Sequence, residues 1–400
     1  MNNKSILYLS NDGIFDHIGE SQILPYLKKN SSFYKFHLLT FEKKNNLKKL
    51  KHKLNELNNF NIKWQPLTYH FGLIGQIYDF LRLFFFVMVF SIFQKNLLIH
   101  CRGYIPAFIC FLISHIFKIR YLFDLRDFWA DEGIEIKKFK LIYKFFKFLE
   151  GKIINRSEHT VCLTDSAKKY VINKYIKKYD RISSNNITVI PCGTDFNLFN
   201  PSLVKSMQIN LIKNRLKIKK KKILLYYGSV GKNYILSRYF YFFRTINIHN
   251  NWIFLFIVNN DLTQLEHKLL SYGFTRNQFK ILNIKRKNLP KYIKLADLSI
   301  FFYRKGMRSL GCSPTKLADL FSMNVPIITD ANLGDMSKIV NFNKNSSLLI
   351  NNFNQHQIRQ KVSKIMQKDK KFNIRKNSSY FNYNYGADKY LKIYSKIINN

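Results

Sequence analysis

The feature that most constrains the fold is an alternation of short apolar runs with longer helical stretches. In the first half of the chain the apolar runs are Ile6–Leu9, Tyr34–Thr40, Leu97–Cys101, Tyr121–Leu125 and Thr160–Leu163. The helical stretches between them are Ser21–Lys29, Asn45–Asn58, Phe80–Phe93 and Lys140–Asn155. Alternation of this kind predicts a parallel sheet with helices on both faces. The nearly continuous apolar character of the strands agrees, because both faces of such a sheet are buried.

A second alternation follows a polar and basic stretch that ends at Lys222. Its apolar runs are Ile223–Tyr227, Trp252–Val258, Leu298–Phe302 and Val325–Thr329. A chain of 400 residues is also too long for one ordinary core. We therefore expect two doubly wound α/β domains of Rossmann-like type, facing a central cleft. The expected ranges are 1–198 for the first domain, 199–222 for a linker, 223–380 for the second domain and 381–400 for a helix that packs back on the first.

Composition agrees with a packed protein but leaves the partner open. Hydrophobic residues make up 46% and charged residues 22% of the chain, which is typical of a globular protein. Lys and Arg number 66 against 24 acidic residues, a formal charge of +42. Such an excess attracts nucleic acid, anionic lipid or phosphorylated substrates, although an AT-rich genome produces the same bias. The aromatic residues fall mainly in apolar runs and no nucleic-acid-binding motif occurs, so we expect no specific nucleic acid as partner.

Cysteine spacing and apolar runs bear on location. The five cysteines are scattered, which predicts free thiols in a reducing compartment and no metal site. The N-terminus has no signal-peptide pattern, so we expect a cytoplasmic protein. The runs Leu83–Phe93 and Gly103–Phe117 are shorter than the ~20 residues that a membrane span needs. They are either buried helices or helices that touch the inner face of the cytoplasmic membrane peripherally.

The loop after the first strand has the composition of a ligand-binding turn. Asp12, Gly13 and Gly19 form a turn that opens onto a helix beginning near Ser21 and Gln22. Permissive glycines and helix N-terminal amides suit the close approach of an anion or of sugar hydroxyls. A plain strand-to-helix turn explains the same pattern.

Charged residues also gather where two later strands of the first half end. His100 and Arg102 end one strand, and Arg126 and Asp127 follow the next. Side chains of these types can orient a hydroxyl group and take its proton, so we assign them as candidate catalytic residues. Three residues nearby are candidates for binding an acceptor: Trp129, Asp131 and Glu132. A histidine at a strand end is also often a structural residue.

In the second half, glycine-containing loops again follow strands. The first carries Gly228, Ser229, Gly231 and Lys232, whose amides, hydroxyl and ammonium can bind a phosphate. It has neither the Walker spacing nor the dinucleotide fingerprint, which argues against a P-loop ATPase and a dehydrogenase. A later loop carries Gly334 and Asp335, which are candidates for contact with a bound sugar or for a helix cap.

The segment from Ser313 to Asp319 is the strongest candidate for a phosphate site. Ser313 is expected to cap a helix with Pro314 in its first turn, so that Thr315 and Asp319 share a face. Lys316 then projects from the first turn, where backbone amides already favour anions. A diphosphate held by the amides and Lys316, with Asp319 on a ribose diol, is chemically coherent; an ordinary capped helix is the alternative.

Several segments together resemble one known family. The most specific is Val189–Phe199, followed by Ile6–Leu27, Phe123–Glu132 and Ser313–Asp330 with Gly334 and Asp335 after it. In these segments the chain resembles the retaining glycosyltransferases of family 4, in particular a subset that assembles bacterial polysaccharides, over its whole length. The resemblance implies the GT-B fold, with an acceptor site in the first domain and a nucleotide-sugar site in the second.

The resemblance also implies a reaction and a set of roles. A sugar would pass from a nucleotide diphosphate to a saccharide or lipid-linked saccharide with retention, as in envelope, capsular or O-antigen polysaccharide synthesis, without a metal or other cofactor. Gly228, Ser229 and Lys316 would hold the diphosphate and Asp319 the ribose. The family's commonest pattern has two glutamates eight positions apart, whereas this chain has Gly311 and Asp319 at those places. A catalytically inactive scaffold of the same fold is therefore the alternative, with a basic nucleic-acid-binding protein after it.

Overall fold

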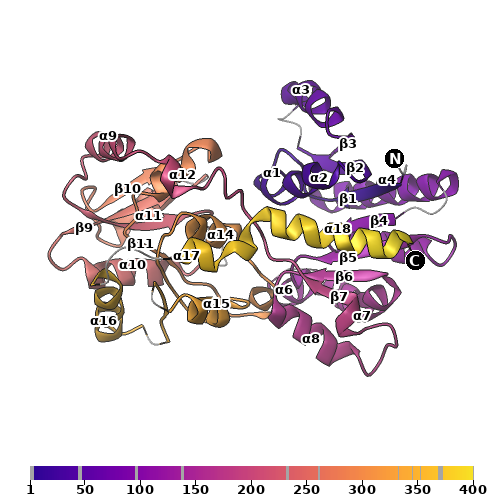
Figure 1. Ribbon diagram of the computed structural model, residues 1–400. Helices are drawn as coiled ribbons and strands as arrows, with labels where there is room; N and C mark the ends of the chain where they lie inside the picture. The colour runs from indigo at the N-terminus through magenta and orange to yellow at the C-terminus, as the bar shows by residue number, and fades with distance from the viewer. Residues whose placement is uncertain are drawn as a thin grey trace. The chain divides into compact units, whose positions relative to one another are not determined.

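The chain folds into two compact α/β units, each built on one parallel sheet (Figure 1). The computed structural model describes residues 4–43, 47–94, 98–136, 139–230, 234–259, 262–331, 333–344, 346–351, 353–367 and 373–399. The first unit comprises Met1–Gly193, Leu310–Cys312 and Tyr383–Asn400, and the second comprises Thr194–Ser309 and Ser313–Asn382. The expected α/β class with two doubly wound sheets is confirmed.

The sheet of the first unit has seven strands in the order β3-β2-β1-β4-β5-β6-β7. Their bounds are β1 Ser5–Ser10, β2 Lys35–Glu42, β3 Ile62–Thr68, β4 Leu98–Arg102, β5 Arg120–Leu125, β6 His159–Cys162 and β7 Ile187–Val189. All neighbouring strands pair in parallel, and Ile6 of β1 lies opposite both Phe36 and Leu98. The sequence did not reveal β3 and β7. Pro66 weakens the strand pattern of β3, and this proline is tolerated because β3 is an edge strand.

Helices flank this sheet, and some begin earlier than expected. They are α1 His17–Gln22, α2 Leu24–Asn30, α3 Leu47–Asn58, α4 Gly72–Phe93, α5 Tyr104–Ile113, α6 Trp129–Ile136, α7 Lys140–Arg156, α8 Asp165–Tyr175 and α18 Tyr383–Asn399. The first helix begins at His17 rather than near Ser21. Ser21 and Gln22 therefore lie inside α1 and are buried, rather than at its N-terminus.

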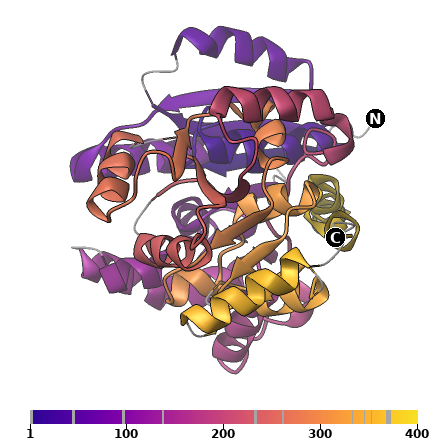
Figure 2. The same cartoon turned by 90° about the vertical axis from the view of Figure 1, so that its left-hand side faces the viewer.

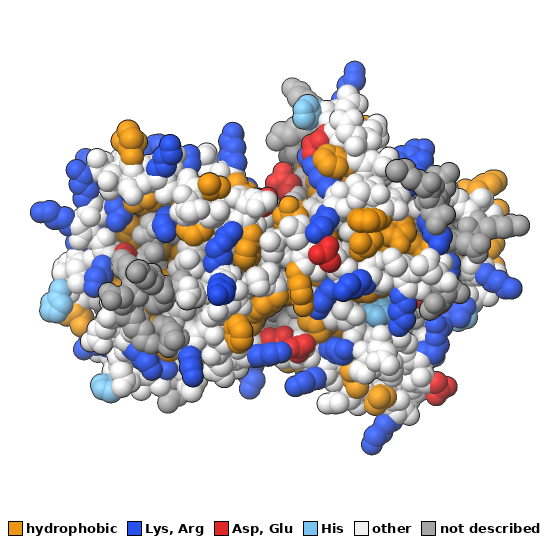
Figure 3. Space-filling model, viewed as in Figure 1, with side chains coloured by type: hydrophobic (Ala, Val, Ile, Leu, Met, Phe, Trp, Pro, Cys, Tyr) orange, Lys and Arg blue, Asp and Glu red, His pale blue; other side chains and the backbone are white. Residues whose placement is uncertain are grey.

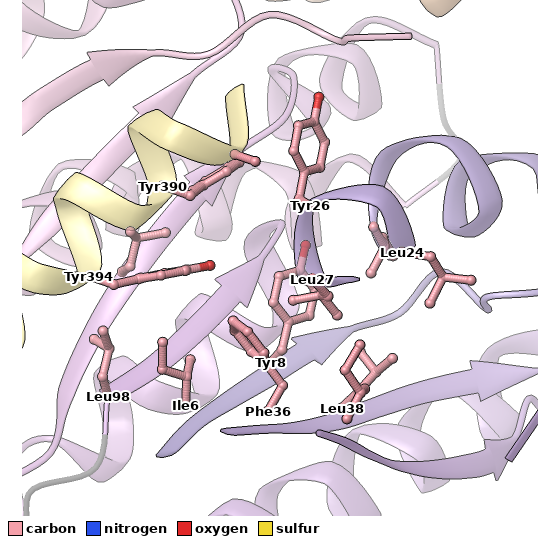
Figure 4. Packing of buried hydrophobic residues seen from close by; sticks show 14 of the residues in the cluster. Ile6, Tyr8, Leu24, Tyr26, Leu27, Phe36, Leu38, Leu98, Tyr390 and Tyr394 are labelled. Carbon is pink, nitrogen blue, oxygen red and sulfur yellow. The ribbon is translucent and has the colours of Figure 1, made fainter. Parts of the chain in front are cut away.

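The C-terminal helix α18 completes the core of the first unit. Tyr390 and Tyr394 of α18 are buried over β1, β2 and α2 (Figure 4). The Tyr390 ring meets the Tyr26 ring edge to face, with centroids 5.5 Å apart. The side chain of Asn30 donates to the carbonyl oxygen of Ala387 over 3.1 Å. Helix α18 therefore belongs to the same compact unit as the first 193 residues.

Helix α4 corrects one expectation. It runs for 22 residues, from Gly72 to Phe93, and is long and apolar enough to cross a membrane by length and composition. The expectation that no segment reaches that length took Asp79 and Arg82 as its limit. In the structure these two residues form an ion pair within the helix, with Arg82 Nη1 3.4 Å from Asp79 Oδ1. The helix therefore continues through both charges.

The sheet of the second unit has six parallel strands in the order β10-β9-β8-β11-β12-β13. Their bounds are β8 Lys222–Tyr227, β9 Trp252–Ile257, β10 Phe279–Leu282, β11 Leu298–Phe301, β12 Ile327–Thr329 and β13 Ser347–Leu349. Helices lie on both sides of these strands (Figure 2). They are α9 Ser206–Leu216, α10 Leu236–Ile246, α11 Leu262–Ser271, α12 Leu289–Ile293, α13 Met307–Leu310, α14 Thr315–Ser322, α15 Met336–Phe342, α16 Gln355–Met366 and α17 Ile374–Asn377.

The range 199–222, which the sequence suggested as a linker, contains helix α9 and falls within the second unit. Its polar and basic composition reflects exposure, because no residue of α9 is buried. Helix α9 and α12 flank a cavity of about 420 Å³ that is lined partly by Lys285 and Lys291. The change of unit falls between Gly193 and Thr194, close to the expected boundary after residue 198.

Candidate functional site

Each sheet reverses its winding at one point, and some of the predicted site residues lie there. In the first unit β1 lies between β2 and β4, and in the second unit β8 lies between β9 and β11. In open α/β sheets ligands bind beyond the carboxyl ends of the strands at such a reversal. Asp12 and Arg102 stand at this place in the first unit, and Gly228 stands at it in the second. The sequence pattern therefore located both edges.

In the second unit, the structure brings Lys316 to the turn after β8. Lys316 is buried, and its Nζ lies 3.7 Å from the ring centroid of Tyr234 and 5.0 Å from that of Tyr226. Gly228 has a φ of +119°, which favours glycine, and a Cβ placed there would lie 3.4 Å from Lys316 Cδ. The aromatic faces stabilise the ammonium group and fix it beside the glycine turn. A cation is thus positioned at the sheet reversal, where an anionic group of a ligand would bind.

The helix that carries Lys316 begins one residue later than expected. Pro314 occupies the N-cap position of α14, and no side chain caps the helix there. Ser313 therefore lies one position before the cap, and Thr315 is the first residue of the helix. Ser313 and Lys316 are buried, whereas Thr315 is half-buried. The first-turn amides and Lys316 still occupy the same end of the helix, as the sequence suggested.

The carboxylate of Asp319 is surrounded by donors from the second unit. Its side chain is fully buried and accepts a hydrogen bond from Tyr227 over 2.6 Å and another from the hydroxyl of Thr194. Arg286 approaches both oxygens, with Nη1 and Nη2 each 3.4 Å away. The nearby carboxylate and burial raise the pKa of Tyr227 well above its usual value, with burial the larger cause. The carboxylate therefore holds the arginine and the tyrosine in place.

The other candidates for the donor site differ in their exposure and hydrogen bonding. Ser229 accepts a hydrogen bond at its carbonyl oxygen from the Tyr226 hydroxyl, and its side chain is exposed. Gly231 and Lys232 lie outside the described residues. Gly334 has a φ of +42° and donates its amide to the carbonyl oxygen of Ser309 over 2.8 Å. Asp335 occupies the N-cap position of α15 without a side-chain cap bond.

In the first unit, Asp124 is the centre of a buried charged cluster at the ends of β4 and β5. Its carboxylate lies 3.2 Å from Arg126 Nη1 and 3.5 Å from Arg102 Nη1. The Tyr390 hydroxyl of α18 donates to it over 3.1 Å. Burial acts to raise the pKa of Asp124, but Arg126, His100 and Arg102 outweigh it and hold that pKa far below the usual range. Two arginines share this carboxylate, and Arg102 also lies near a second one, with 3.6 Å between Arg102 Nε and Asp12 Oδ2.

His100 is part of this cluster and is sealed from solvent. It is 1% exposed, its Nδ1 lies 2.7 Å from the Tyr394 hydroxyl, and its Nε2 lies 3.4 Å from Asp124. Burial is the largest cause that lowers the pKa of His100. A neutral imidazole packed 4.1 Å from the Tyr8 ring fits a residue that positions Asp124. Arg102 and Arg126 lie nearer the surface of the cluster than His100.

The first loop is tightly organised around Glu42 of β2. The Glu42 carboxylate accepts the amide of Ile14 over 2.6 Å and the hydroxyl of Thr40 over 2.8 Å. A Cβ on Gly19 would lie 2.2 Å from the carbonyl oxygen of Gly13, so only glycine allows α1 to approach this turn. Asp12 is half-buried, with Oδ2 3.6 Å from Arg102 Nε. Asp12 is thus the candidate of this loop that reaches the charged cluster.

Two further candidates of the loop serve packing within the unit. The Gln22 side chain donates to the carbonyl oxygen of Gly193 over 2.8 Å. The Ser21 hydroxyl donates to the carbonyl oxygen of His17 over 2.6 Å, within α1. The Gln22 bond therefore holds α1 against the chain at Gly193, and the Ser21 bond stabilises α1 itself.

The remaining candidates follow β5: Asp127 lies before α6, and Trp129, Asp131 and Glu132 lie on it. Trp129 packs against the rings of Tyr104, Tyr143 and Phe146, with centroids 4.7–5.7 Å away. Asp131 pairs with Lys147 at 2.6 Å, and burial is the main cause of its raised pKa. Glu132 is buried and Asp127 is half-buried. The rings of this region contact one another, so packing accounts for the aromatic residues there.

Gly311, at the place of the family's first glutamate, has little room for a side chain. It belongs to the first unit together with Leu310 and Cys312. A Cβ at this position would lie 3.1 Å from a ring carbon of Phe128, which is fully buried, and 3.4 Å from the Cα of Asp127. The backbone of this segment is tied down by Thr164, whose hydroxyl donates to the carbonyl oxygen of Leu310 over 2.8 Å. Packing at Phe128 thus explains the glycine.

The sequence pattern did not indicate several residues that make contacts at the carboxyl edges of the two sheets. They are Tyr8, Glu42, Tyr390 and Tyr394 in the first unit and Thr194, Tyr227 and Arg286 in the second. Most are far from their partners along the chain. The one accessible signal was the strand position of Tyr8 and Tyr227, each near the carboxyl end of the first strand of its unit.

Comparison with known proteins gives one family match. Residues 208–383 match the family described as Glycosyl transferases group 1. The matched range contains Gly228, Lys316 and Asp319. None of the curated proteins matches the chain.

Solved structures show that the fold is the GT-B fold. Alr3699/HepE of Anabaena, solved in complex with UDP and glucose, superposes with a TM-score of 0.71 at 12% identity, covering 98% of this chain and 100% of its own. A glycosyltransferase of Rickettsia africae gives 0.72 at 15% identity, with 100% of both chains covered. Sucrose-phosphate synthase of Thermosynechococcus elongatus gives 0.68 at 13% identity, with 99% of this chain and 100% of its own covered.

The face drawn in Figure 3 bears on the nucleic-acid-binding alternative. On the face seen in Figure 3, Lys and Arg side chains are scattered over each unit and do not gather into one stripe. Acidic side chains are few on the same face. A scattered excess fits a solvated basic surface better than a specific nucleic-acid interface.

Proposed function

We propose that the protein is a glycosyltransferase that takes a sugar from a nucleotide-diphosphate donor. The observation that carries this proposal is the position of Lys316. Its ammonium is held beside the Gly228 turn, at the reversal of the second sheet, within the range that matches group 1 glycosyl transferases. Two of the similar structures, both of Alr3699/HepE, were solved with UDP and glucose or with UDP-glucose, so uridine is the first base to test.

The chemistry we propose for this site is charge stabilisation of a departing diphosphate. As the bond to the sugar breaks, negative charge develops on the phosphate oxygens. Lys316 and the first-turn amides of α14 would stabilise that charge without reorganisation, because both are already fixed in place. We propose that no metal ion is required.

The acceptor belongs to the first unit in this proposal. We propose a saccharide or lipid-linked saccharide of envelope, capsular or O-antigen polysaccharide synthesis, at a site on the cytoplasmic side of the membrane. Its hydroxyl would attack from the face that the diphosphate leaves, so that the anomeric configuration is retained. Asp12, Arg102 and Arg126 are the charged side chains nearest to such an acceptor in our assignment.

A panel of UDP-, GDP-, ADP- and CMP-sugars tests the proposal. We expect one nucleotide class to raise the melting temperature of the protein, because a ligand that binds only the folded state stabilises it. We expect sugar transfer from the same donor, with a product of unchanged anomeric configuration by NMR. The absence of stabilisation by every donor would contradict the proposal.

Variants at two lysines make this test specific. Lys316→Gln should lower kcat by about 100- to 1000-fold, the usual cost of losing one group that stabilises transition-state charge. Lys268→Gln, at an exposed position in the last turn of α11, should leave kcat unchanged. Donor binding without transfer by the wild type would instead support the inactive scaffold, for which the missing acid at Gly311 is the motivating observation.

A further inference from the structure

Three helices of the first unit turn apolar side chains outward. The most exposed of these side chains belong to α4, α7, their flanking residues and the turn after α5. They are Ile74 at 84%, Phe93 and Leu141 at 81%, Phe71 at 74%, Ile116 at 72% and Phe148 at 68% exposed. We call this surface the apolar face. An exposed surface of this kind indicates an interaction site in a folded protein.

The apolar face is continuous because α5 lies between α4 and α7. The ring of Phe108 on α5 lies 6.1 Å from that of Phe80 on α4 and 5.8 Å from that of Phe145 on α7. Helix α5 therefore contacts both α4 and α7 through aromatic side chains. We treat the outward side chains of these three neighbouring helices as one surface.

Helix α4 is attached to the unit along one narrow stripe. Only Asp79, Leu83 and Val87 are buried, at a spacing of four residues, so that they share one side of the helix. Asp79 accepts the backbone amide of His70 over 2.8 Å, and its other oxygen lies 2.7 Å from His70 Nδ1. To cross a bilayer, α4 would have to leave this stripe and expose the charged pair of Asp79 and Arg82 to lipid. The attachment favours a helix that lies along a membrane surface.

The charges on these helices favour an anionic partner. The only acidic residues of α4, α5 and α7 are Asp79 and Glu150, and both are buried. Lys140, Lys144 and Lys152 of α7 are exposed beside the apolar side chains. Lys152 Nζ lies 5.0 Å from the centroid of the Phe148 ring. Apolar side chains bordered by lysines are the pattern of a helix in the plane of an anionic membrane surface.

We propose that the apolar face binds an anionic lipid bilayer, with α4 lying in the interface plane and not spanning it. Helix α4 begins directly after β3, so its start stands at the same edge of the sheet as Asp12 and Arg102. Docking by this face therefore holds that edge next to the lipid headgroups. This second statement rests on the proposed function, because it brings a lipid-linked acceptor to the acceptor edge.

Vesicle co-sedimentation tests the proposal. Wild-type protein should bind vesicles of phosphatidylcholine with one quarter phosphatidylglycerol, and bind less at high salt. The double variant Ile74→Glu with Leu141→Glu should partition at least about tenfold more weakly, because two side chains that would enter the bilayer become charged. Met207→Glu, an equally exposed apolar position of α9 in the second unit, should bind like the wild type.

A second variant separates the ionic contribution to vesicle binding from the apolar contribution. Replacing Lys140, Lys144 and Lys152 together by Gln should remove most of the difference between anionic and neutral vesicles, since each lysine near an anionic surface adds about a factor of five. The substituted positions are exposed, so the melting temperature should remain that of the wild type.

Three results would overturn the proposal. They are no binding of the wild type to anionic vesicles at low salt, unchanged binding by the Ile74→Glu and Leu141→Glu variant, or a wild-type dimer that this variant converts to a monomer. The last result would mean that a second copy covers the face. Donor-induced thermal stabilisation measured without vesicles separates this outcome from failure of the proposed function, because it depends on the second unit alone.

Discussion

Each unit has a fully buried aspartate near the carboxyl edge of its sheet, Asp124 in the first and Asp319 in the second, and the two have different partners. Asp124 in the first unit lies between Arg102 and Arg126, whose side chains are 5% and 13% exposed. Asp319 in the second unit lies against one arginine, Arg286, which is 21% exposed. In the first cluster Asp124 pairs with both arginines, and Asp12 is a second partner of Arg102. The second cluster is a single pair, and Lys316 lies at a separate position beside Tyr234.

The two units therefore position their cationic side chains in different ways. In the first unit the carboxylate keeps two arginines close together despite their mutual repulsion, and tyrosines of α18 cover the cluster. In the second unit the carboxylate neutralises its arginine, so the cation at the glycine turn is Lys316, held by aromatic rings. Substitutions at the two carboxylates should therefore have unequal consequences.

The largest effect is expected from Asp124→Asn. This change leaves Arg126 without its ion-pair partner and Arg102 with Asp12 alone, and removing one partner of a buried ion pair costs about 3–5 kcal/mol in the free energy of unfolding. Hydrogen exchange of peptides from β4 and β5 measures the loss within the first unit. Asp16→Asn, which removes an exposed pair with Lys43, should cost less than about 1 kcal/mol. Equal protection in the Asp124→Asn variant and the wild type would contradict the account.

Asp319→Asn should cost less, about 2–3 kcal/mol, because Arg286 keeps some contact with water. The loss should appear in peptides of β8 and α14 and leave those of β5 unchanged. A loss greater than that of Asp124→Asn would reverse the comparison between the two clusters.

Mild acid should separate the units as well. His159 of β6 is buried, and burial, with Lys396 and Lys168, lowers its pKa to about 4. A depressed histidine pKa contributes stability above its unfolded value of about 6.5, and that stability is lost as the pH falls toward the folded value. Between pH 7 and pH 5 the first unit should lose about 2 kcal/mol from this residue.

Hydrogen exchange at both pH values, corrected for intrinsic rates, checks this loss. The three histidines of the second unit, His249, His267 and His356, are exposed, so its peptides should change less. In a His159→Gln variant the acid-dependent loss in the first unit should shrink by about 2 kcal/mol, and the remaining part belongs to His100, whose pKa burial also lowers. An undiminished loss would assign the acid sensitivity to groups other than His159.

The smallest effect is expected from Tyr227→Phe. The hydroxyl of Tyr227 makes one hydrogen bond of 2.6 Å to Asp319, and its loss should cost about 1–2 kcal/mol in the second unit. Tyr390→Phe, which removes the 3.1 Å bond to Asp124, is the matched change in the first unit. A clearly larger loss of stability for Tyr390→Phe would show that the hydroxyls contribute more to the stability of the first cluster than the arginines do.

Much of this arrangement could be read from the sequence because it depends on local pattern. The apolar runs at Ile6–Leu9 and Ile223–Tyr227 predicted the first strand of each sheet, and strand ends then indicated the ligand edge. Short edge strands such as β10 and β13 have too few apolar residues to stand out. Helix α4 was underestimated because Asp79 and Arg82 neutralise each other within it, which sequence alone does not show.

The partners of the site residues could not be predicted, for a physical reason. Asp319 meets Tyr227, Arg286 and Thr194, which come from β8, the segment after β10 and the start of the unit. His100 meets Tyr394, 294 positions away. Such contacts follow from the order of strands in the sheet and not from the spacing of residues along the chain. In the sequence, a histidine or charged residue at a strand end therefore looks the same whether it faces a ligand or a buried partner.

Calorimetric titration with UDP tests whether Lys316 binds the donor diphosphate. It measures binding at the second unit without an acceptor. The account predicts that Lys316→Gln weakens UDP binding by about 10- to 100-fold, the value of a charge-assisted contact with a phosphate, and that Lys268→Gln leaves it unchanged. Equal UDP affinity of Lys316→Gln and the wild type would contradict the assignment of Lys316 to the donor diphosphate.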